Sequence, residues 1–130
     1  MNGQANLEVM RRTLDAFQRG DIASLSALIS PEAIWHVPGR NPLARDYRGH
    51  PEVFGFFGKL MESTGGTFRL EPIDMLANER GGIYIDRARA ERAGKSLDVM
   101  LILRVSIRDG RITEGWDCFH QEQLWDSFWE

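Results

Sequence analysis

Two residues of this sequence, Asp117 and His36, have side chains suited to moving a proton near neutral pH. A carboxylate buried among apolar groups loses hydration, which raises its pKa towards the working pH and lets it act as an acid or a base. Histidine needs little adjustment, because its ordinary pKa is about 6.5. We therefore take Asp117 and His36 as the candidate catalytic pair. The alternatives stay open: a solvated or interface aspartate, and a histidine that bonds to the backbone of a loop.

Whether Asp117 can take this role depends on the face of its predicted strand. Side chains alternate along a strand, so Asp117 and Phe119 share one face, whereas Trp116, Cys118 and His120 share the other. The alternation does not say which face is concave, and a bulge would exchange the two.

Six further residues could line a binding pocket. Asp98, Met100 and Arg104 share one face of a predicted strand, and a tyrosine could donate a hydrogen bond to a substrate oxygen. A sheet edge or an ion pair is the alternative for Asp98 and Arg104, and core packing is the alternative for Tyr84. The pocket-binding candidates are Tyr47, Tyr84, Asp98, Met100, Arg104 and Trp116.

Other kinds of site lack their residues in this sequence. The three histidines do not have the paired spacing of metal ligands, so we expect no metal. Gly55 and Gly58 are not followed by the Gly-Lys-Ser/Thr of a phosphate loop, and there is no nucleophile-elbow motif of a serine hydrolase. We therefore expect no cofactor.

Size and composition are those of one ordinary globular domain. The chain has 130 residues, of which 42% are hydrophobic, and we expect a single domain over residues 1–130. A net charge of −3 argues against nucleic acid or an acidic membrane as a partner. The single cysteine fits a reducing compartment, and neither a signal peptide nor a membrane-spanning apolar run is visible. We expect a cytoplasmic protein.

The hydrophobic period changes along the chain from helical to strand-like. Apolar residues three to four apart predict helices over residues 7–19 and 21–29, and a third that begins near Pro51. A short strand is expected at residues 33–37, followed by a loop at 38–50. Strands at 67–77, 81–91, 96–108 and 111–120 then form an antiparallel meander, before a last helix at 123–129. Helices followed by strands predict an α+β fold around a pocket.

Five segments carry a likeness to a known family: AFQRGDIASL at residues 16–25, WHVPG with NPL at 35–43, YRG at 47–49, DGRITEGW at 109–116 and WDSFW at 125–129. Together they resemble the nuclear transport factor 2-like superfamily over essentially the whole chain. Within it, the sequence is most similar to the SnoaL-like and ketosteroid-isomerase-like branch.

This resemblance implies a cone-shaped, curved sheet with three N-terminal helices at its wide end, enclosing a mostly apolar pocket. It implies an apolar small molecule as ligand or substrate, and a homodimer that pairs sheet to sheet. Some members are isomerases, cyclases, dehydratases or epoxide hydrolases, and others do not catalyse a reaction. The resemblance also puts Asp117 roughly where SnoaL-like cyclases carry their acid/base aspartate.

Two enzyme types of the superfamily do not match. With residues 109–112 aligned, the last aspartate of limonene-epoxide hydrolases falls at Cys118, and their earlier Arg and Asp fall near Ile85 and Arg87. The tyrosine of ketosteroid isomerases would lie in residues 7–19, which contain none. The sequence therefore predicts a small SnoaL-like acid/base isomerase, cyclase or dehydratase. A non-catalytic hydrophobic-ligand-binding or dimeric interaction module is the alternative.

Overall fold

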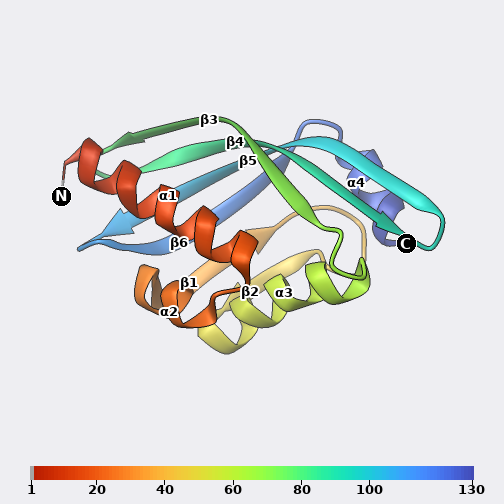
Figure 1. Ribbon diagram of the computed structural model, residues 1–130, viewed down its shortest axis with the longest axis horizontal. Coiled ribbons are helices and arrows are strands. Elements are labelled where there is room, and N and C mark those ends of the chain that lie inside the picture. Colours follow the sequence, from red (N-terminus) through yellow and green to blue (C-terminus); the bar gives the residue numbers. More distant parts are fainter. Residues whose placement is uncertain (1) are drawn as a thin grey trace.

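A computed structural model describes residues 2–130, which form helices and strands around one curved sheet (Figure 1). The α+β prediction is confirmed. In chain order the elements are α1 (Gly3–Arg19), α2 (Ile22–Leu28), β1 (Ile29–Val37), β2 (Arg45–Arg48), α3 (Gly49–Ser63), β3 (Arg69–Asn78), β4 (Gly81–Arg92), β5 (Lys95–Arg108), β6 (Arg111–Phe119) and α4 (Glu122–Trp129).

The strands lie in the order β2-β1-β6-β5-β4-β3. The predicted meander is present as β3 to β6, whose neighbours pair antiparallel. The sheet as a whole is mixed, because β1 starts at Ile29, earlier than predicted, and runs parallel to β6. Pro31 has no N–H to donate, and it lies where the register between β1 and β6 shifts.

The predicted loop at residues 38–50 is shorter than expected, because it contains β2 and the start of α3. Strand β2 pairs antiparallel with β1, and Trp35 lies opposite Tyr47. Tyr47 is the one buried residue of β2, and its three neighbours in the strand are charged and exposed. Four residues with a single apolar side chain carry too little alternation to predict a strand.

Local signals account for the ends of several elements. Gly20 ends α1 in the left-handed conformation at φ 65°, and Asp21 begins α2 by accepting a hydrogen bond from the Ser24 N–H at 3.1 Å. Asp109 and Gly110 both have positive φ, 52° and 77°, as a two-residue turn between antiparallel strands requires.

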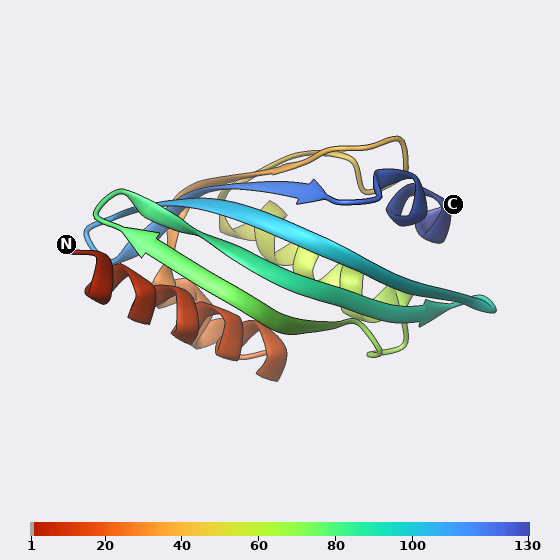
Figure 2. The same cartoon turned by 90° about the horizontal axis from the view of Figure 1, so that it is seen from above.

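The helices lie on one side of the sheet and leave a space between them. Helix α1 packs against β3 and β4, and α3 packs against β1 and β2, on the same side of the curved sheet (Figure 2). Helix α4 lies at one end, against β5 and β6. The middle of the concave face, formed by β4, β5 and β6, therefore lies between α1 and α3.

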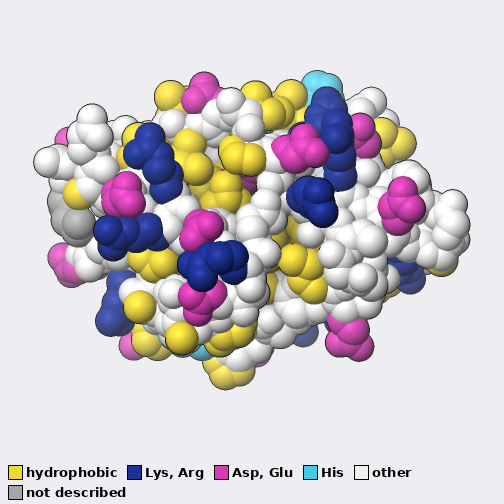
Figure 3. Space-filling view, viewed as in Figure 1, with side chains coloured by type: hydrophobic (Ala, Val, Ile, Leu, Met, Phe, Trp, Pro, Cys, Tyr) yellow, Lys and Arg dark blue, Asp and Glu magenta, His cyan; other side chains and the backbone are white. Residues whose placement is uncertain are grey.

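The outer surface mixes charges of both signs. Figure 3 shows Lys and Arg side chains interspersed with Asp and Glu over the face that carries α1 and β3. In the part of the chain that the structure describes, no helix is long and apolar enough to cross a membrane.

Candidate functional site

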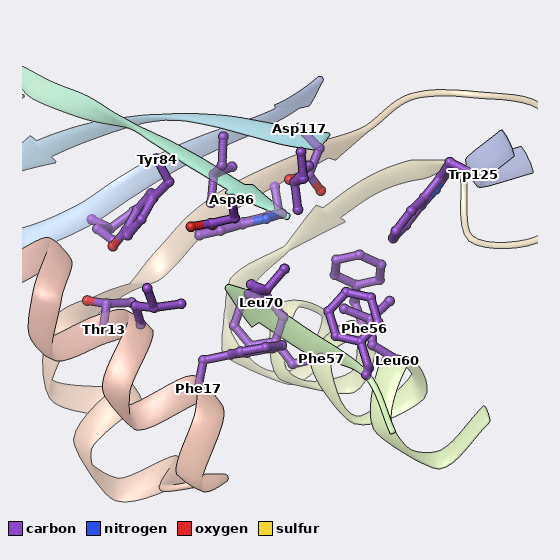
Figure 4. Close-up of a pocket in the computed structure, with 16 residues that line it drawn as sticks. Thr13, Phe17, Phe56, Phe57, Leu60, Leu70, Tyr84, Asp86, Asp117 and Trp125 are labelled. Carbon is purple, nitrogen blue, oxygen red and sulfur yellow. The ribbon is translucent and has the colours of Figure 1, made fainter. Parts of the chain in front are cut away.

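A narrow cavity lies between the concave face of the sheet and helices α1 and α3, with Trp125 of α4 at one end (Figure 4). Its volume of about 60 Å³ has room for a slim ligand. Five of its lining residues are only half-buried, so solvent reaches part of the wall: Leu14, Phe57, Leu70, Leu103 and Asp117. Its walls are mostly apolar; the lining residues are Thr13, Leu14, Phe17, Trp35, Phe56, Phe57, Leu60, Phe68, Leu70, Tyr84, Asp86, Leu101, Leu103, Ile112, Asp117 and Trp125.

Asp117 lies on β6 with its side chain in the cavity. It pairs with Leu103 of β5, which pairs in turn with Tyr84 of β4, so the three residues form one row across the concave face. Asp117 is half-buried, and the loss of hydration among the apolar walls raises the pKa of its carboxyl to about 7. The structure thus decides the question that alternation left open, because the face that carries Asp117 is the concave one.

Asp86 is a second carboxyl group in the cavity, and sequence reasoning missed it. It lies on β4 opposite Leu101, which lies opposite Phe119 of β6, in the row next to that of Asp117. The residue is only 2% exposed, and within residues 2–130 no hydrogen-bond donor reaches its Oδ1. Burial raises the pKa of Asp86 to about 6.

The two carboxyl groups lie on strands that are not adjacent. Burial is the cause of the pKa shift at each, and the charge of the other carboxyl contributes to neither. Strand β5 lies between their strands, which places β4 and β6 roughly 10 Å apart. Asp86 and Asp117 therefore lie in neighbouring rows on strands that are not adjacent.

The polar end of the cavity is built by Thr13 and Tyr84 beside Asp86 (Figure 4). The Tyr84 hydroxyl donates its proton to the Met10 carbonyl at 2.7 Å, and the Thr13 hydroxyl donates to the Val9 carbonyl at 2.7 Å. Burial, and secondly the charge of Asp86, raise the pKa of Tyr84. Both hydroxyl groups thus donate their protons to carbonyls of α1, so towards a ligand they can act only as hydrogen-bond acceptors.

His36 lies on the other face of the sheet, away from the cavity. Its Nδ1 is 2.7 Å from Asp46 Oδ1, its Nε2 is 2.5 Å from Glu114 Oε2, and its ring stacks on Trp116 at 5.5 Å. Hydrogen bonds, first to Glu114 and then to Asp46, raise the pKa of His36. His36 pairs with Trp116, and Trp35 pairs with Gly115, so the two pairs point to opposite faces of the sheet. Asp117 shares its face with Gly115. The structure therefore does not bring His36 and Asp117 to a common point.

Of the six predicted pocket residues, only Tyr84 lines the cavity. The Tyr47 hydroxyl donates to the Leu43 carbonyl at 2.8 Å within the core, beyond the cavity wall. Strand alternation turns the remaining four residues away from Leu101 and Leu103, onto the convex face: Asp98, Met100, Arg104 and Trp116. There, Asp98 forms an ion pair with Arg87 at 3.1 Å, and the Arg104 guanidinium lies 4.5 Å from the centre of the Trp116 ring.

A glycine next to Asp117, Gly115, makes room for the Trp35 ring in the cavity wall. The ring of Trp35 lies flat against Gly115, two residues before Asp117 on the same face of β6. A Cβ atom at Gly115 would stand 2.9 Å from Trp35 Cδ2 and Cε2, closer than such contacts allow. The absence of a side chain at Gly115 therefore lets Trp35 fill the space next to the carboxyl group.

Helix α4 closes one end of the cavity, and contacts at two adjacent residues in its second half, Asp126 and Ser127, hold it in place. Asp126 Oδ1 accepts hydrogen bonds from the Arg40 N–H at 2.9 Å and from Asn41 Nδ2 at 2.7 Å. Lys95 Nζ donates to the Ser127 carbonyl at 2.8 Å, where a cation complements the C-terminal end of a helix. These contacts fix Trp125 over the cavity (Figure 4).

As for metals, residues 2–130 contain no group of three or more His, Cys, Asp or Glu arranged to hold an ion. The chemistry that the cavity itself offers is that of its two carboxyl groups.

Comparisons with known proteins place this architecture in a family. The family model described as "SnoaL-like domain" matches residues 10–115. The chain is 35% identical over 130 residues to "Uncharacterized protein Rv0034" of Mycobacterium tuberculosis, covering 99% of both chains. It is 37% identical to Bal32a from a soil-derived mobile gene cassette, with a TM-score of 0.95 and 98% of both chains covered.

A more distant likeness shows the fold alone. TerC, crystallised with polyporic acid, is 19% identical, with a TM-score of 0.82 over 95% of this chain and 97% of TerC. The family model, by contrast, matches most of the chain. The chain belongs to the SnoaL-like domain family.

Proposed function

We propose that this protein is a cofactor-independent acid/base enzyme that moves a proton on an apolar small molecule, with Asp117 as the group that takes and returns the proton. The observation that carries the proposal is a carboxyl group of pKa about 7 on the wall of an apolar cavity. Near neutral pH such a carboxyl exists in both protonation states, as a group that first removes and then returns a proton requires.

Isomerisation, cyclisation and dehydration are the reactions that this arrangement suits. Each needs a proton removed at one atom and supplied at another. Asp86 is a second carboxyl in the same cavity, so one ligand can meet Asp117 at one atom and Asp86 at another. Membership of the SnoaL-like family, and the co-crystallisation of the similarly folded TerC with polyporic acid, support a small-molecule ligand.

Hydrogen–deuterium exchange tests the proposal before the natural substrate is known. Slim apolar ketones are incubated with the protein in D2O, and NMR follows exchange of the protons next to the carbonyl group. We expect Asp117→Asn to slow the catalysed exchange by about 100-fold or more, the usual contribution of a general base.

The matched control for this experiment is Asp98→Asn. It removes the same carboxylate from the convex face, where Asp98 is paired with Arg87, and it should leave exchange unchanged. If Asp117→Asn exchanges ketone protons as fast as the unaltered protein, the assignment of Asp117 is wrong. Ligands that bind in the cavity without any exchange would favour the non-catalytic binding module instead.

We also propose that two copies pair through the convex face of the sheet. Ile83 is 37% exposed there, and Ile85, Met100, Ile102 and Trp116 are half-buried. Strand pairing places Ile83 opposite Arg104, and Arg104 opposite Trp116, on the face turned away from the cavity. An apolar sheet face of this kind suits a self-complementary contact between identical subunits.

A further inference from the structure

The cavity has a polar end and an apolar end. Figure 4 shows Thr13, Tyr84 and Asp86 together on one side of it, with Phe56, Leu60 and Trp125 on the other. Contacts agree with this view, because Tyr84 bonds to Met10 one turn before Thr13 on α1, and Asp86 follows Tyr84 on the same face of β4. A ligand that fills the cavity lengthwise must therefore carry a polar group at one end only.

At the polar end, the protein offers hydrogen-bond acceptors. The hydroxyl protons of Thr13 and Tyr84 are directed to backbone carbonyls of α1. Asp86, when ionised, has acceptors alone, and among the described residues its Oδ1 has no partner. A ligand group that supplies donors fits this end, and one that supplies only acceptors leaves Asp86 buried without a partner.

The charged residues of the cavity wall also favour a ligand that donates hydrogen bonds and carries a positive charge. The cavity's sixteen lining residues, all within the described part of the chain, include two carboxyl groups and no Lys, Arg or His. A buried carboxylate without a counter-charge is costly, and a cationic ligand removes that cost. The aromatic rings around the cavity, among them Phe17 and Tyr84, also favour a cation over their faces.

We propose that the ligand is an apolar primary amine, bound as the ammonium ion with its charged group between Thr13, Tyr84 and Asp86 and its apolar body towards Phe56, Leu60 and Trp125. This assignment rests on the proposed function and deepens it. A primary ammonium has three donors, and the polar end has three acceptor groups. Asp86 anchors the charge, and Asp117 is left free to act on the part of the ligand between the two ends.

The predicted pH dependence follows from Asp86. The cation needs the ionised carboxylate, and burial sets the pKa of Asp86 at about 6. Affinity for the amine should therefore be high at pH 7.5 and should fall as the pH drops through about 6. The other titratable groups facing the ligand are Asp117, half-protonated near pH 7, and Tyr84, which stays neutral over this range.

Isothermal titration calorimetry with three probes of one shape tests the inference. n-Hexylamine, 1-hexanol and hexanoate have the same slim chain and differ in the charge and donors of one end. At pH 7.5 we expect n-hexylamine to bind at least ten-fold more tightly than 1-hexanol, and hexanoate to bind more weakly than both. Equal affinities for the amine and the alcohol, or no binding of the amine, would overturn the inference.

Variants locate the site of the preference. Asp86→Asn keeps the side-chain shape and should remove the ten-fold preference for the amine, whereas Asp98→Asn on the convex face should keep it. Thr13→Val, which removes one acceptor, should reduce the preference several-fold if Asp86→Asn does not fold. A preference that survives in both Asp86→Asn and Thr13→Val, each shown to be folded by circular dichroism, would contradict the assignment.

The two proposals fail in different ways. If exchange of ketone protons depends on Asp117 but no amine preference is found, only the ligand assignment is wrong. If the amine preference depends on Asp86 but exchange never depends on Asp117, the cavity binds amines and the proposed catalysis is wrong.

Discussion

At the scale of single residues, the site is defined by two carboxyl groups, of which the sequence revealed one. Asp117 could be proposed from the sequence because it lies on a recognisable strand and because the family likeness points to it. Asp86 could not, because it stands between Ile85 and Arg87 in a strand whose other face is rich in arginine, a pattern typical of a solvated surface. The one available signal was its parity with Tyr84 and Ala88, which are buried.

A buried carboxyl group of raised pKa also makes a prediction for stability. The folded protein holds the Asp86 proton up to a pKa of about 6, whereas the unfolded chain releases it near 3.8. The folded state thus binds more protons between these values, so this contribution to stability is present at low pH and is lost as the pH rises through about 6. Asp86→Asn should therefore raise the free energy of unfolding at pH 8 by about 1–3 kcal/mol, with little effect at pH 4.

Urea unfolding of the variant and the unaltered protein at pH 4 and pH 8 measures this difference directly. Hydrogen bonds to Ser24 lower the pKa of Asp21, so Asp21 changes the stability with pH in the opposite direction. This contribution is the same in both proteins and cancels in the difference between their free energies of unfolding. Asp98→Asn is the control and should show no such pH-dependent gain. If Asp86→Asn is no more stable than the unaltered protein at pH 8, Asp86 does not carry a destabilising charge.

At the scale of elements, the strands and helices place the carboxyl groups by register. The helices and the four-stranded meander were predictable from hydrophobic period and from turn residues such as Asp109 and Gly110. The parallel pairing of β1 with β6 was not, because no local signal records which strands meet across a chain separation from Ile29 to Ile112. That pairing places the Trp35 ring against Gly115, beside Asp117. The sequence alone therefore could not predict this part of the cavity wall.

The contact of β1 with β6 can be tested at Gly115. Gly115→Ala adds a methyl group 2.9 Å from the Trp35 ring, so Trp35 must move towards the cavity. We expect the free energy of unfolding to fall by about 1–3 kcal/mol, as for other over-packed cores, and deuterium exchange catalysed by Asp117 to weaken.

Gly58→Ala is the matched control for this substitution. Gly58 lies in α3 with nothing within 4 Å of an added Cβ, so alanine there should leave exchange unchanged and stabilise the helix by roughly 0.5–1 kcal/mol. A Gly115→Ala protein as stable and active as Gly58→Ala would show that Trp35 does not depend on the missing side chain.

At the scale of the whole molecule, the sheet separates two kinds of surface. Its concave face holds the cavity, and its convex face holds the cluster of His36, Glu114, Trp116 and Arg104. Sequence reasoning paired His36 with Asp117 because both side chains can move a proton near neutral pH. The two-residue period of β1 and β6 puts them on opposite faces once the parallel register is known.

The proposed pairing of two copies through this face predicts a particle of twice the chain mass of 14.9 kDa in sedimentation velocity. Ile83→Asp places a charge at the centre of the contact and should shift the protein to the mass of one chain. Ile22→Asp, at a more exposed isoleucine of α2 on the helical side, should leave the pair intact. A single-chain mass for the unaltered protein at micromolar concentration would rule the pairing out.

The pH dependence of deuterium exchange by the unaltered protein and by Asp117→Asn tests the central claim most directly. If Asp117 removes the proton as its carboxylate, the exchange rate of a bound ketone rises with pH, passes its midpoint at about 7 and then levels off. The Asp117→Asn protein should lack this rise. A profile in which Asp117→Asn keeps both the rate and the midpoint of the unaltered protein would contradict the account.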